Sequence, residues 1–554
     1  MHAEIILTGN VLTLDARSTR AQAIAVGRGR VLLAGSREQV MALRGPGTRV
    51  HDFGSATLLP GFNDTHAHMS TVGIKTLRPS LAGARSIADI QARVRELARA
   101  TPKGQWIVTM PVGEPPFYAA GSAILAEGRL PNRQELDAAA PDHPVYLSSP
   151  GGYWGQMPCL SAMNSAGLKA NGITRDTQPG APGLTIERDA NGEPTGVFRE
   201  ANFVSVIELA LLPAVPRFTP SDRMEALRRG QRMCHAKGTT SIYEGHGVAP
   251  AVVADFKALH AAGELSMRSH LVLGPDWGSM AEAREAMGTR MQEARGRGTG
   301  DATLRVSGVF IPSYGDTGLN GLFRRNPADL GWGDYLRFVH GPAEFAELAE
   351  CAARNDLRVN TVVSDRLHDL APVLADLATR HPIGERRWVM EHVSQCRAAD
   401  VDVLASTGCA VTLIPAHFVW KYGHRFTQLP ADEHALVAPA ALLLERGAPV
   451  SAGTDAVPWD PLVSVWAMSQ RKTKKDGAVL GPSGRVSVEA ALRLITSAGA
   501  WLSFEEDVKG TLEPGRYADI AVLKNDPLAA DGDAILDNEC IATLVGGRWV
   551  HGEP

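Results

Sequence analysis

LPGFNDTHAH (residues 59–68) is the most informative stretch of this 554-residue chain. An apolar approach and the turn-forming pair Pro60-Gly61 lead to two histidines one residue apart, His66 and His68. Because side chains on a β-strand alternate between its faces, we expect both histidines to project from one face at the carboxyl end of a strand. Two such imidazoles can bind one divalent cation, and Asp64 is placed to orient one of them. A pair of ordinary loop histidines is the alternative.

Composition limits the class of protein. The chain is too long for a single core, so we expect a large catalytic domain and a smaller one. A net charge of −4 and a pI near 6.5 argue against a nucleic-acid partner. The six cysteines form no CxxC pair, which is typical of reduced thiols: Cys159, Cys234, Cys351, Cys396, Cys409 and Cys540. With no signal-peptide pattern and no membrane-length apolar run, we expect a soluble cytoplasmic protein that binds no membrane.

Both ends of the chain are predicted to form β structure. Short apolar runs separated by glycine-containing turns occupy residues 3–14, 21–26, 30–34, 57–59, 518–523, 541–545 and 549–550. Neither end carries enough apolar surface for a core of its own. We therefore expect residues 1–58 and 501–554 to pair into one small β-sandwich domain.

The middle of the chain alternates between strand and helix patterns. Buried strands are predicted at residues 239–243, 268–273, 303–311, 357–363, 388–390, 410–414 and 449–452. Helices are predicted at residues 222–236, 249–262, 342–354, 367–379 and 437–446. This alternation predicts an α/β fold with a (β/α)8 TIM-like barrel over residues 59–500. Residues from about 75 to 216 break the rhythm, and we interpret them as an insertion after the first barrel strand, lying over the active-site mouth.

Further candidate ligands follow other predicted strands, where barrel enzymes carry their catalytic groups. Glu244 and His246 come directly after residues 239–243, His392 ends the run Val389-Met390-Glu391-His392, and Asp455 follows residues 449–452. Each has a structural alternative. His392 alone could be a core histidine, Asp455 could cap the next helix, and Glu244 with His246 could form an exposed turn.

The residue types at these strand ends favour metal-assisted hydrolysis. A divalent cation held by histidine and aspartate, with one open position, lowers the pKa of bound water to about 7. A carboxylate beside that water can accept its proton and pass it to a leaving amine. We therefore assign Asp455 as the catalytic base, with His392 as a ligand or an oxyanion donor.

The chain resembles the amidohydrolase superfamily in four motifs: residues 59–68, Met390-Glu391-His392, AGTDAVPWDP (452–461) and GTLEPGRYADIAVL (510–523). LPNRQELDAAAPDHPVYL (130–147), NSAGLKANGI (164–173) and GEPTGVFRE (192–200) resemble its third subfamily, typified by N-substituted formamide deformylases and YtcJ-type metal-dependent hydrolases. The resemblance covers nearly the whole chain. It implies a metal-dependent barrel flanked by a β-sandwich and hydrolysis of non-peptide C–N bonds. By position it makes His66, His68, His392 and Asp455 metal ligands.

Two positions depart from the paired-metal members of that superfamily. Their fourth strand carries a lysine that bridges the metals, whereas residues 304–310 contain none and place Phe310 or a neighbour there. Their fifth-strand histidine corresponds by spacing to Thr361. We therefore expect one cation per chain, most simply zinc, rather than two. Glu244 and His246 are candidates to compensate from the second strand.

These observations predict an amidase-type hydrolase of a small hydrophobic or aromatic substrate containing an amide, formamide or carbamate. Four aromatic residues are candidates for the substrate pocket: Phe117, Tyr153, Trp154 and Trp332. The alternative is an isomerase, hydratase or decarboxylase on the same scaffold, or a metal-free binding descendant. Association into a homo-oligomer is left open.

Overall fold

The computed structural model describes residues 2–553 except for 116–117, 119–120, 152–154, 203–204, 275, 326–338 and 531. The chain forms two compact units. One comprises Met1–Met69, Leu227–Gly315 and Val339–Pro554, and the other comprises Ser70–Ala226 and Asp316–Phe338. The predicted insertion of about 75–216 lies within the second unit's first segment, and its placement over the active-site mouth stays a prediction.

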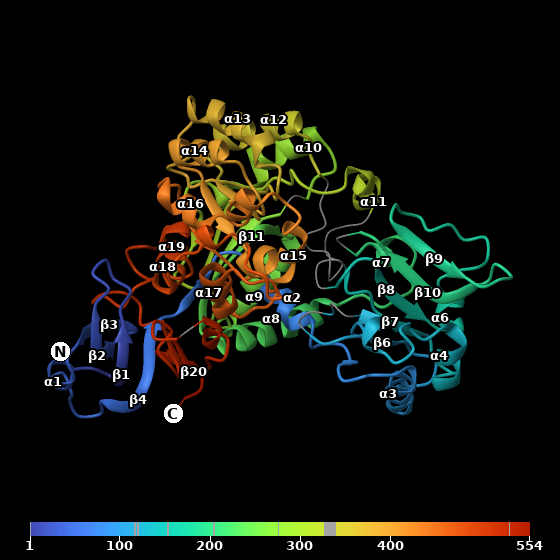
Figure 1. Cartoon of the computed structure of the whole chain (residues 1–554), viewed down its shortest axis with the longest axis horizontal. Coiled ribbons are helices and arrows are strands. Elements are labelled where there is room, and N and C mark those ends of the chain that lie inside the picture. Colours follow the sequence, from blue (N-terminus) through green and yellow to red (C-terminus); the bar gives the residue numbers. More distant parts are fainter. Residues whose placement is uncertain are drawn as a thin grey trace. The chain divides into compact units, whose positions relative to one another are not determined.

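The first unit contains the predicted barrel (Figure 1). Its eight parallel strands follow chain order: β5 (Phe62–Asp64), β11 (Thr239–Val248), β12 (Arg268–Leu273), β14 (Leu304–Phe310), β15 (Val359–Val362), β16 (Val389–Glu391), β17 (Ala410–Leu413) and β18 (Val450–Ala452). A short strand, β13 (Thr299–Gly300), pairs with β14. The interior is filled by Tyr243, Val272, Phe310, Val362, Val389, Ala410 and Leu502. The α/β barrel prediction is confirmed.

The barrel closes through side chains and loop backbone rather than through a ladder between β5 and β18. Thr454, which follows β18, donates its backbone N–H to Asp64 Oδ1 at 2.9 Å. The backbone N–H of Asp455 donates to the carbonyl of His66 at 2.8 Å. These bonds bring the segments after the first and last strands together, which is where the candidate site lies.

Helices alternate with the barrel strands. The longer ones are α8 (Pro220–His235), α9 (Pro250–Ala261), α12 (Pro342–Arg354), α13 (Leu367–Ala378), α14 (Ala398–Thr407) and α17 (Pro461–Gln470). Short helices are α2 (Met69–Ile74), α10 (Met280–Glu285), α11 (Asn320–Arg325), α15 (Gly423–Phe426), α16 (Ala440–Glu445), α18 (Val488–Leu494) and α19 (Ser497–Leu502). In the described part of the chain, no helix is both long and apolar enough to cross a bilayer.

Both chain ends meet in one seven-stranded sheet, ordered β21-β20-β19-β4-β1-β2-β3. Its strands are β1 (Ile5–Leu12), β2 (Arg20–Gly27), β3 (Arg30–Gly35), β4 (Arg49–Pro60), β19 (Ile520–Leu523), β20 (Cys540–Val545) and β21 (Arg548–His551). Apolar clusters centred on Leu58 and Val40 provide cores, and α1 (Arg37–Met41) contributes to the second. This sheet is the predicted terminal β domain.

The second unit has a sheet of its own, ordered β6-β7-β8-β10-β9. The strands are β6 (Ile107–Thr109), β7 (Val145–Leu147), β8 (Cys159–Met163), β9 (Leu184–Arg188) and β10 (Pro194–Glu200). Its helices include α3 (Ile87–Ala100), α4 (Arg133–Ala139), α6 (Ser165–Ala170) and α7 (Ile207–Ala210).

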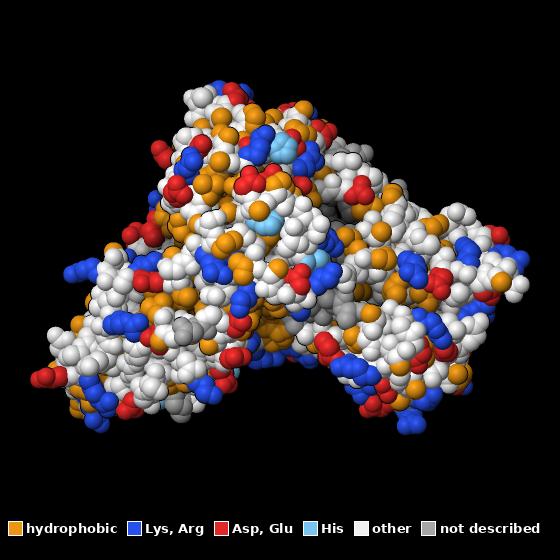
Figure 2. All heavy atoms as spheres, in the orientation of Figure 1, with side chains coloured by type: hydrophobic (Ala, Val, Ile, Leu, Met, Phe, Trp, Pro, Cys, Tyr) orange, Lys and Arg blue, Asp and Glu red, His pale blue; other side chains and the backbone are white. Residues whose placement is uncertain are grey.

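On the face of the protein drawn in Figure 2, acidic and basic side chains are interspersed, consistent with the small net charge.

Candidate metal centre

His66 and His68 lie just beyond the first barrel strand, not on it as the sequence suggested. β5 ends at Asp64, and the chain then bends before α2. The bend arises because the Asp64 carboxylate accepts the backbone N–H groups of His66, at 3.2 Å, and Thr454. Asp64 therefore orients backbone, and the expectation that it orients an imidazole is wrong. The two imidazoles still meet, with ring centroids 5.2 Å apart.

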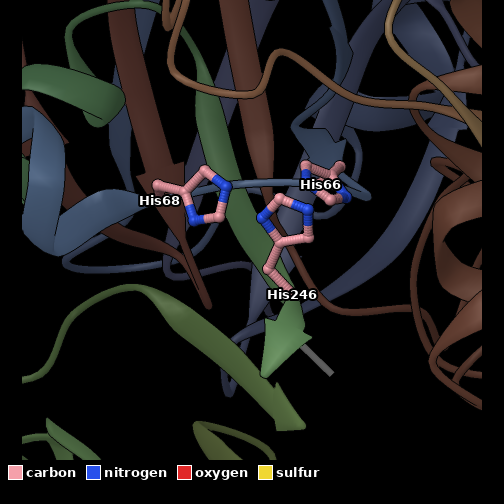
Figure 3. A group of neighbouring side chains, drawn as sticks. All are labelled: His66, His68 and His246. Carbon is pink, nitrogen blue, oxygen red and sulfur yellow. The ribbon is translucent and has the colours of Figure 1, made fainter. Parts of the chain in front are cut away.

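His246 joins these two histidines from the end of β11 (Figure 3). Its ring centroid is 4.7 Å from that of His66 and 5.1 Å from that of His68. The three side chains offer ligand atoms that all lie within 4.8 Å of one another. Pairing between β11 and β12 changes register after Glu244, so strict strand alternation does not decide the direction of His246.

His392 and Asp455 complete a second overlapping cluster with His66, again within 4.8 Å. The Nε2 atoms of His392 and His66 are 2.9 Å apart. Asp455 Oδ1 lies 3.2 Å from His68 Nε2 and 3.6 Å from His66 Nε2. Both His392 and Asp455 adopt left-handed backbone conformations, with φ of 57° and 59°. Such strain in non-glycine residues concentrates at functional sites.

Glu244 contacts His68 on the side of the imidazole that faces away from Asp455. Its Oε1 accepts the backbone N–H of Met69 at 2.8 Å, and its Oε2 is 3.5 Å from His68 Nδ1. That nitrogen is opposite to Nε2, the His68 atom that faces Asp455. The geometry therefore favours Glu244 as a support for His68 rather than as a ligand.

Two further residues border the centre without having been assigned a role from the sequence. His417 follows β17 in a π-helical turn, Ala416–Lys421, and its Nδ1 lies 3.9 Å from Asp455 Oδ2. Its position after the seventh barrel strand is the sequence signal that identifies it. Glu391 ends β16, and its Oε2 lies 3.6 Å from His66 Nδ1.

The fourth and fifth strands present no ligand at the positions where paired-metal relatives carry lysine and histidine. The Phe310 ring packs 5.4 Å, centroid to centroid, from that of His246. Thr361 donates its hydroxyl to the carbonyl of Ile311 at 2.7 Å. Both side chains are therefore engaged in packing or backbone bonding.

Burial and mutual proximity set the charge states. Burial lowers the pKa of His66, His246 and His392, which favours neutral imidazoles. For His68 burial acts in the same direction, but the carboxylates of Asp455 and Glu244 outweigh it and raise the pKa to about 10. Burial would raise the pKa of Asp455, yet the histidines around it hold that pKa well below its usual range.

This donor set fits a divalent cation of the zinc class. Nitrogen and carboxylate oxygen are the ligands such ions prefer. All five side chains, His66, His68, His246, His392 and Asp455, belong to the described residues, and all but His246 are almost fully buried. The predicted pocket residues Phe117, Tyr153, Trp154 and Trp332 lie outside the described residues.

The sequence profile of the amidohydrolase family (Amidohydro_3) matches residues 49–551. The chain belongs to the amidohydrolase family. N-substituted formamide deformylase of Arthrobacter pascens is 26% identical over 565 residues, covering 98% of this chain and 97% of that protein. Putative amidohydrolase YtcJ of Bacillus subtilis is 25% identical and covers 98% of both chains. These matches confirm the resemblance to the amidohydrolase superfamily that the motifs indicated. They also confirm the prediction that the protein is an amidohydrolase.

Solved structures agree with the fold. An uncharacterized metal-dependent hydrolase from Pyrococcus horikoshii OT3 matches with a TM-score of 0.68 and 20% identity, covering 95% of this chain and 99% of that one. Atrazine chlorohydrolase TrzN from Arthrobacter aurescens TC1, complexed with zinc, matches with a TM-score of 0.51 and 14% identity, covering 99% and 95%. At these identities the likeness supports the barrel architecture alone.

Proposed function

We propose that this amidohydrolase cleaves a non-peptide C–N bond of a small substrate by using one divalent cation, most simply zinc. The proposed ligands are His66, His68, His246, His392 and Asp455. The convergence of these side chains from four barrel strand ends carries the proposal. When bound, such a cation acidifies water and polarises a carbonyl group.

Asp455 supplies the proton-transfer group. Its low pKa leaves the carboxylate ionised, so it can accept a proton from the attacking water. Its Oδ2 faces His392 Nε2 at 3.8 Å and His417 Nδ1 at 3.9 Å, while Oδ1 faces His66 and His68. The same carboxyl group then returns the proton to the leaving nitrogen.

One cation is proposed because two strands lack the residues of a paired site. By the resemblance, Phe310 or a neighbour takes the position of the bridging lysine, and Thr361 takes that of the fifth-strand histidine. His246 provides the additional imidazole from the second strand. These same departures motivate the second candidate, a non-hydrolytic reaction on the same scaffold.

Formamides, other amides and carbamates are the proposed substrates. The name of the Arthrobacter pascens relative, similar over nearly the full length of both chains, supports a formyl or acyl group on nitrogen. Aryl formamides are therefore the first compounds to examine.

The test measures amine release from aryl formamides, acetamides and carbamates before and after chelation. We expect chelator-sensitive hydrolysis restored by Zn²⁺, and a loss of at least about 100-fold in kcat for Asp455→Asn. Asp402→Asn, which changes an exposed carboxylate paired with Arg446, is the matched control and should retain activity. Bound metal without hydrolysis of any compound would favour the non-hydrolytic candidate.

A further inference from the structure

A buried polar chain crosses the barrel from Tyr243 to His66. The Tyr243 hydroxyl donates to Asn360 Oδ1 at 3.1 Å, and Asn360 Nδ2 donates to Glu391 Oε1 at 2.8 Å. Glu391 Oε2 then faces His66 Nδ1 at 3.6 Å. Tyr243 is 3% exposed and the other three residues are fully buried. This series of polar side chains links β11, β15 and β16 to the segment after β5.

The two atoms at the His66 end of this polar chain, Glu391 Oε2 and His66 Nδ1, face each other. Among the described residues, neither His66 Nδ1 nor Glu391 Oε2 has a hydrogen-bond partner, although both are buried. Leaving a buried polar group unsatisfied is unfavourable, so a facing donor and acceptor are expected to pair. Their separation of 3.6 Å exceeds hydrogen-bond distance, so pairing requires the two groups to approach each other when a cation is bound.

The Glu391 carboxylate is confined on its other side as well. A Cβ added to Gly245 in β11 would lie 2.0 Å from Glu391 Oε1. Only a residue without a side chain leaves space for the carboxylate there. The hydrogen bond from Asn360 holds Glu391 Oε1, and Gly245 leaves space for it because it has no side chain. Glu391 Oε2 is then the oxygen that faces His66.

We propose that Glu391 is a positioning residue that accepts the Nδ1–H of His66 and so presents Nε2 to the cation. The inference rests on the proposed function, because it needs His66 to be a ligand. His66 Nε2 already lies toward His392 and Asp455, at 2.9 Å and 3.6 Å. Carboxylates that hold the far nitrogen of a ligating histidine fix its tautomer and ring orientation. The fifth strand thus supports the centre through Asn360, although it supplies no ligand.

The decisive variant is Glu391→Gln, which keeps the shape of the side chain and replaces one carboxyl oxygen with an amide nitrogen. We expect its dissociation constant for Zn²⁺, measured by chelator competition on the full chain, to rise about 10- to 100-fold. The Co²⁺-loaded variant should also show a changed visible absorption spectrum. Glu505→Gln is the matched control, since Glu505 is a largely buried carboxylate paired with Lys509 at 2.6 Å, and it should change neither readout.

Two milder variants keep the inference falsifiable if Glu391→Gln does not fold. Asn360→Ala and Tyr243→Phe remove successive anchors of the chain, and we expect a larger loss of Zn²⁺ affinity for the first. Wild-type affinity and an unchanged Co²⁺ spectrum in the folded variants would overturn the inference while leaving the proposed function intact. Absence of Zn²⁺ binding by the wild type would instead overturn the proposed function.

Discussion

At the residue scale, the candidate centre combines histidines that burial keeps neutral with one aspartate that its neighbours keep ionised. His66, His246 and His392 have lowered pKa values, and Asp455 has a pKa well below its usual range. These are the protonation states that metal ligation requires. His68 differs, because Asp455 and Glu244 raise its pKa to about 10 despite burial. Metal affinity is therefore expected to fall with decreasing pH.

A buried histidine outside the centre gives a pH-dependent stability prediction. His235 Nδ1 donates to the Thr239 carbonyl at 2.8 Å, and Nε2 lies 2.9 Å from the Ser266 hydroxyl. Burial lowers its pKa from 6.5 to about 4. Between these values the unfolded chain binds more protons than the native one, so stability rises with pH across this window and is lost on acidification. From pH 7.5 to pH 5, His235→Gln should lose about 2 kcal/mol of its destabilisation relative to wild type in urea unfolding.

A difference between wild type and His235→Gln that stays constant with pH would contradict this assignment. It would mean that His235 titrates alike in the folded and unfolded states.

Part of the centre could be predicted from individual residues. His66, His68, His392 and Asp455 follow apolar strands directly, and the structure brings them together. The role of Asp64 could not be predicted, because it depends on the backbone of Thr454, which is distant in sequence. Glu391 was overlooked as a functional residue because its relation to His66 and Asn360 exists only in the closed barrel.

At the element scale, β11 connects the metal centre with the interior of the barrel. The strand was predicted at residues 239–243 and extends to Val248. Glycines at 245 and 247 weaken the local strand pattern, but pairing with β12 at Glu244 and Val248 extends the strand. Its residues from Tyr243 to His246 contribute to the polar chain, to the support of His68 and to the ligand cluster.

Gly245→Ala tests whether β11 requires a bare backbone at this position. The new Cβ would overlap the Glu391 carboxylate, so we expect a loss of about 1–3 kcal/mol in the free energy of unfolding and weaker metal binding. Gly288→Ala is the control, because nothing lies within 4 Å of its added Cβ. Chemical denaturation and metal analysis provide the readouts. Equal stability of the two variants would show that Glu391 moves freely.

Most elements could be predicted from periodicity. The helix at Pro342–Arg354 and the strand at Arg268–Leu273 have the predicted bounds. The helix predicted at residues 437–446 is shorter, Ala440–Glu445, because Pro439 lacks an N–H and restricts the residue before it. Local sequence shows where a proline interrupts a pattern but does not fix which side the helix occupies.

At the scale of the whole molecule, a buried ion pair joins the terminal sheet to the barrel. Arg268 at the start of β12 contacts Asp519, just before β19, through Nε at 2.6 Å and Nη2 at 3.0 Å. The Asp519 carboxylate also accepts the backbone N–H of Gly546 at 2.7 Å. The C-terminal part of the terminal sheet is therefore held directly to the barrel strand β12.

Asp519→Ala should destabilise the chain strongly. It leaves the Arg268 guanidinium buried without a counter-charge, at a cost of about 3–5 kcal/mol. Glu539→Ala removes a carboxylate from an exposed pair with Lys524 and should cost less than about 1 kcal/mol. Thermal and urea unfolding distinguish the two. Similar small losses would indicate that the terminal sheet is held by its apolar contacts alone.

The metal content per chain tests the central claim most directly. Elemental analysis of the purified protein, supplemented with Zn²⁺ and dialysed, should give about one divalent cation per chain for the wild type. We predict a value near zero for the His66→Ala/His68→Ala double variant and a reduced value for His246→Ala, with both variants folded. Two cations per chain, or the same content in wild type and variants, would contradict the account.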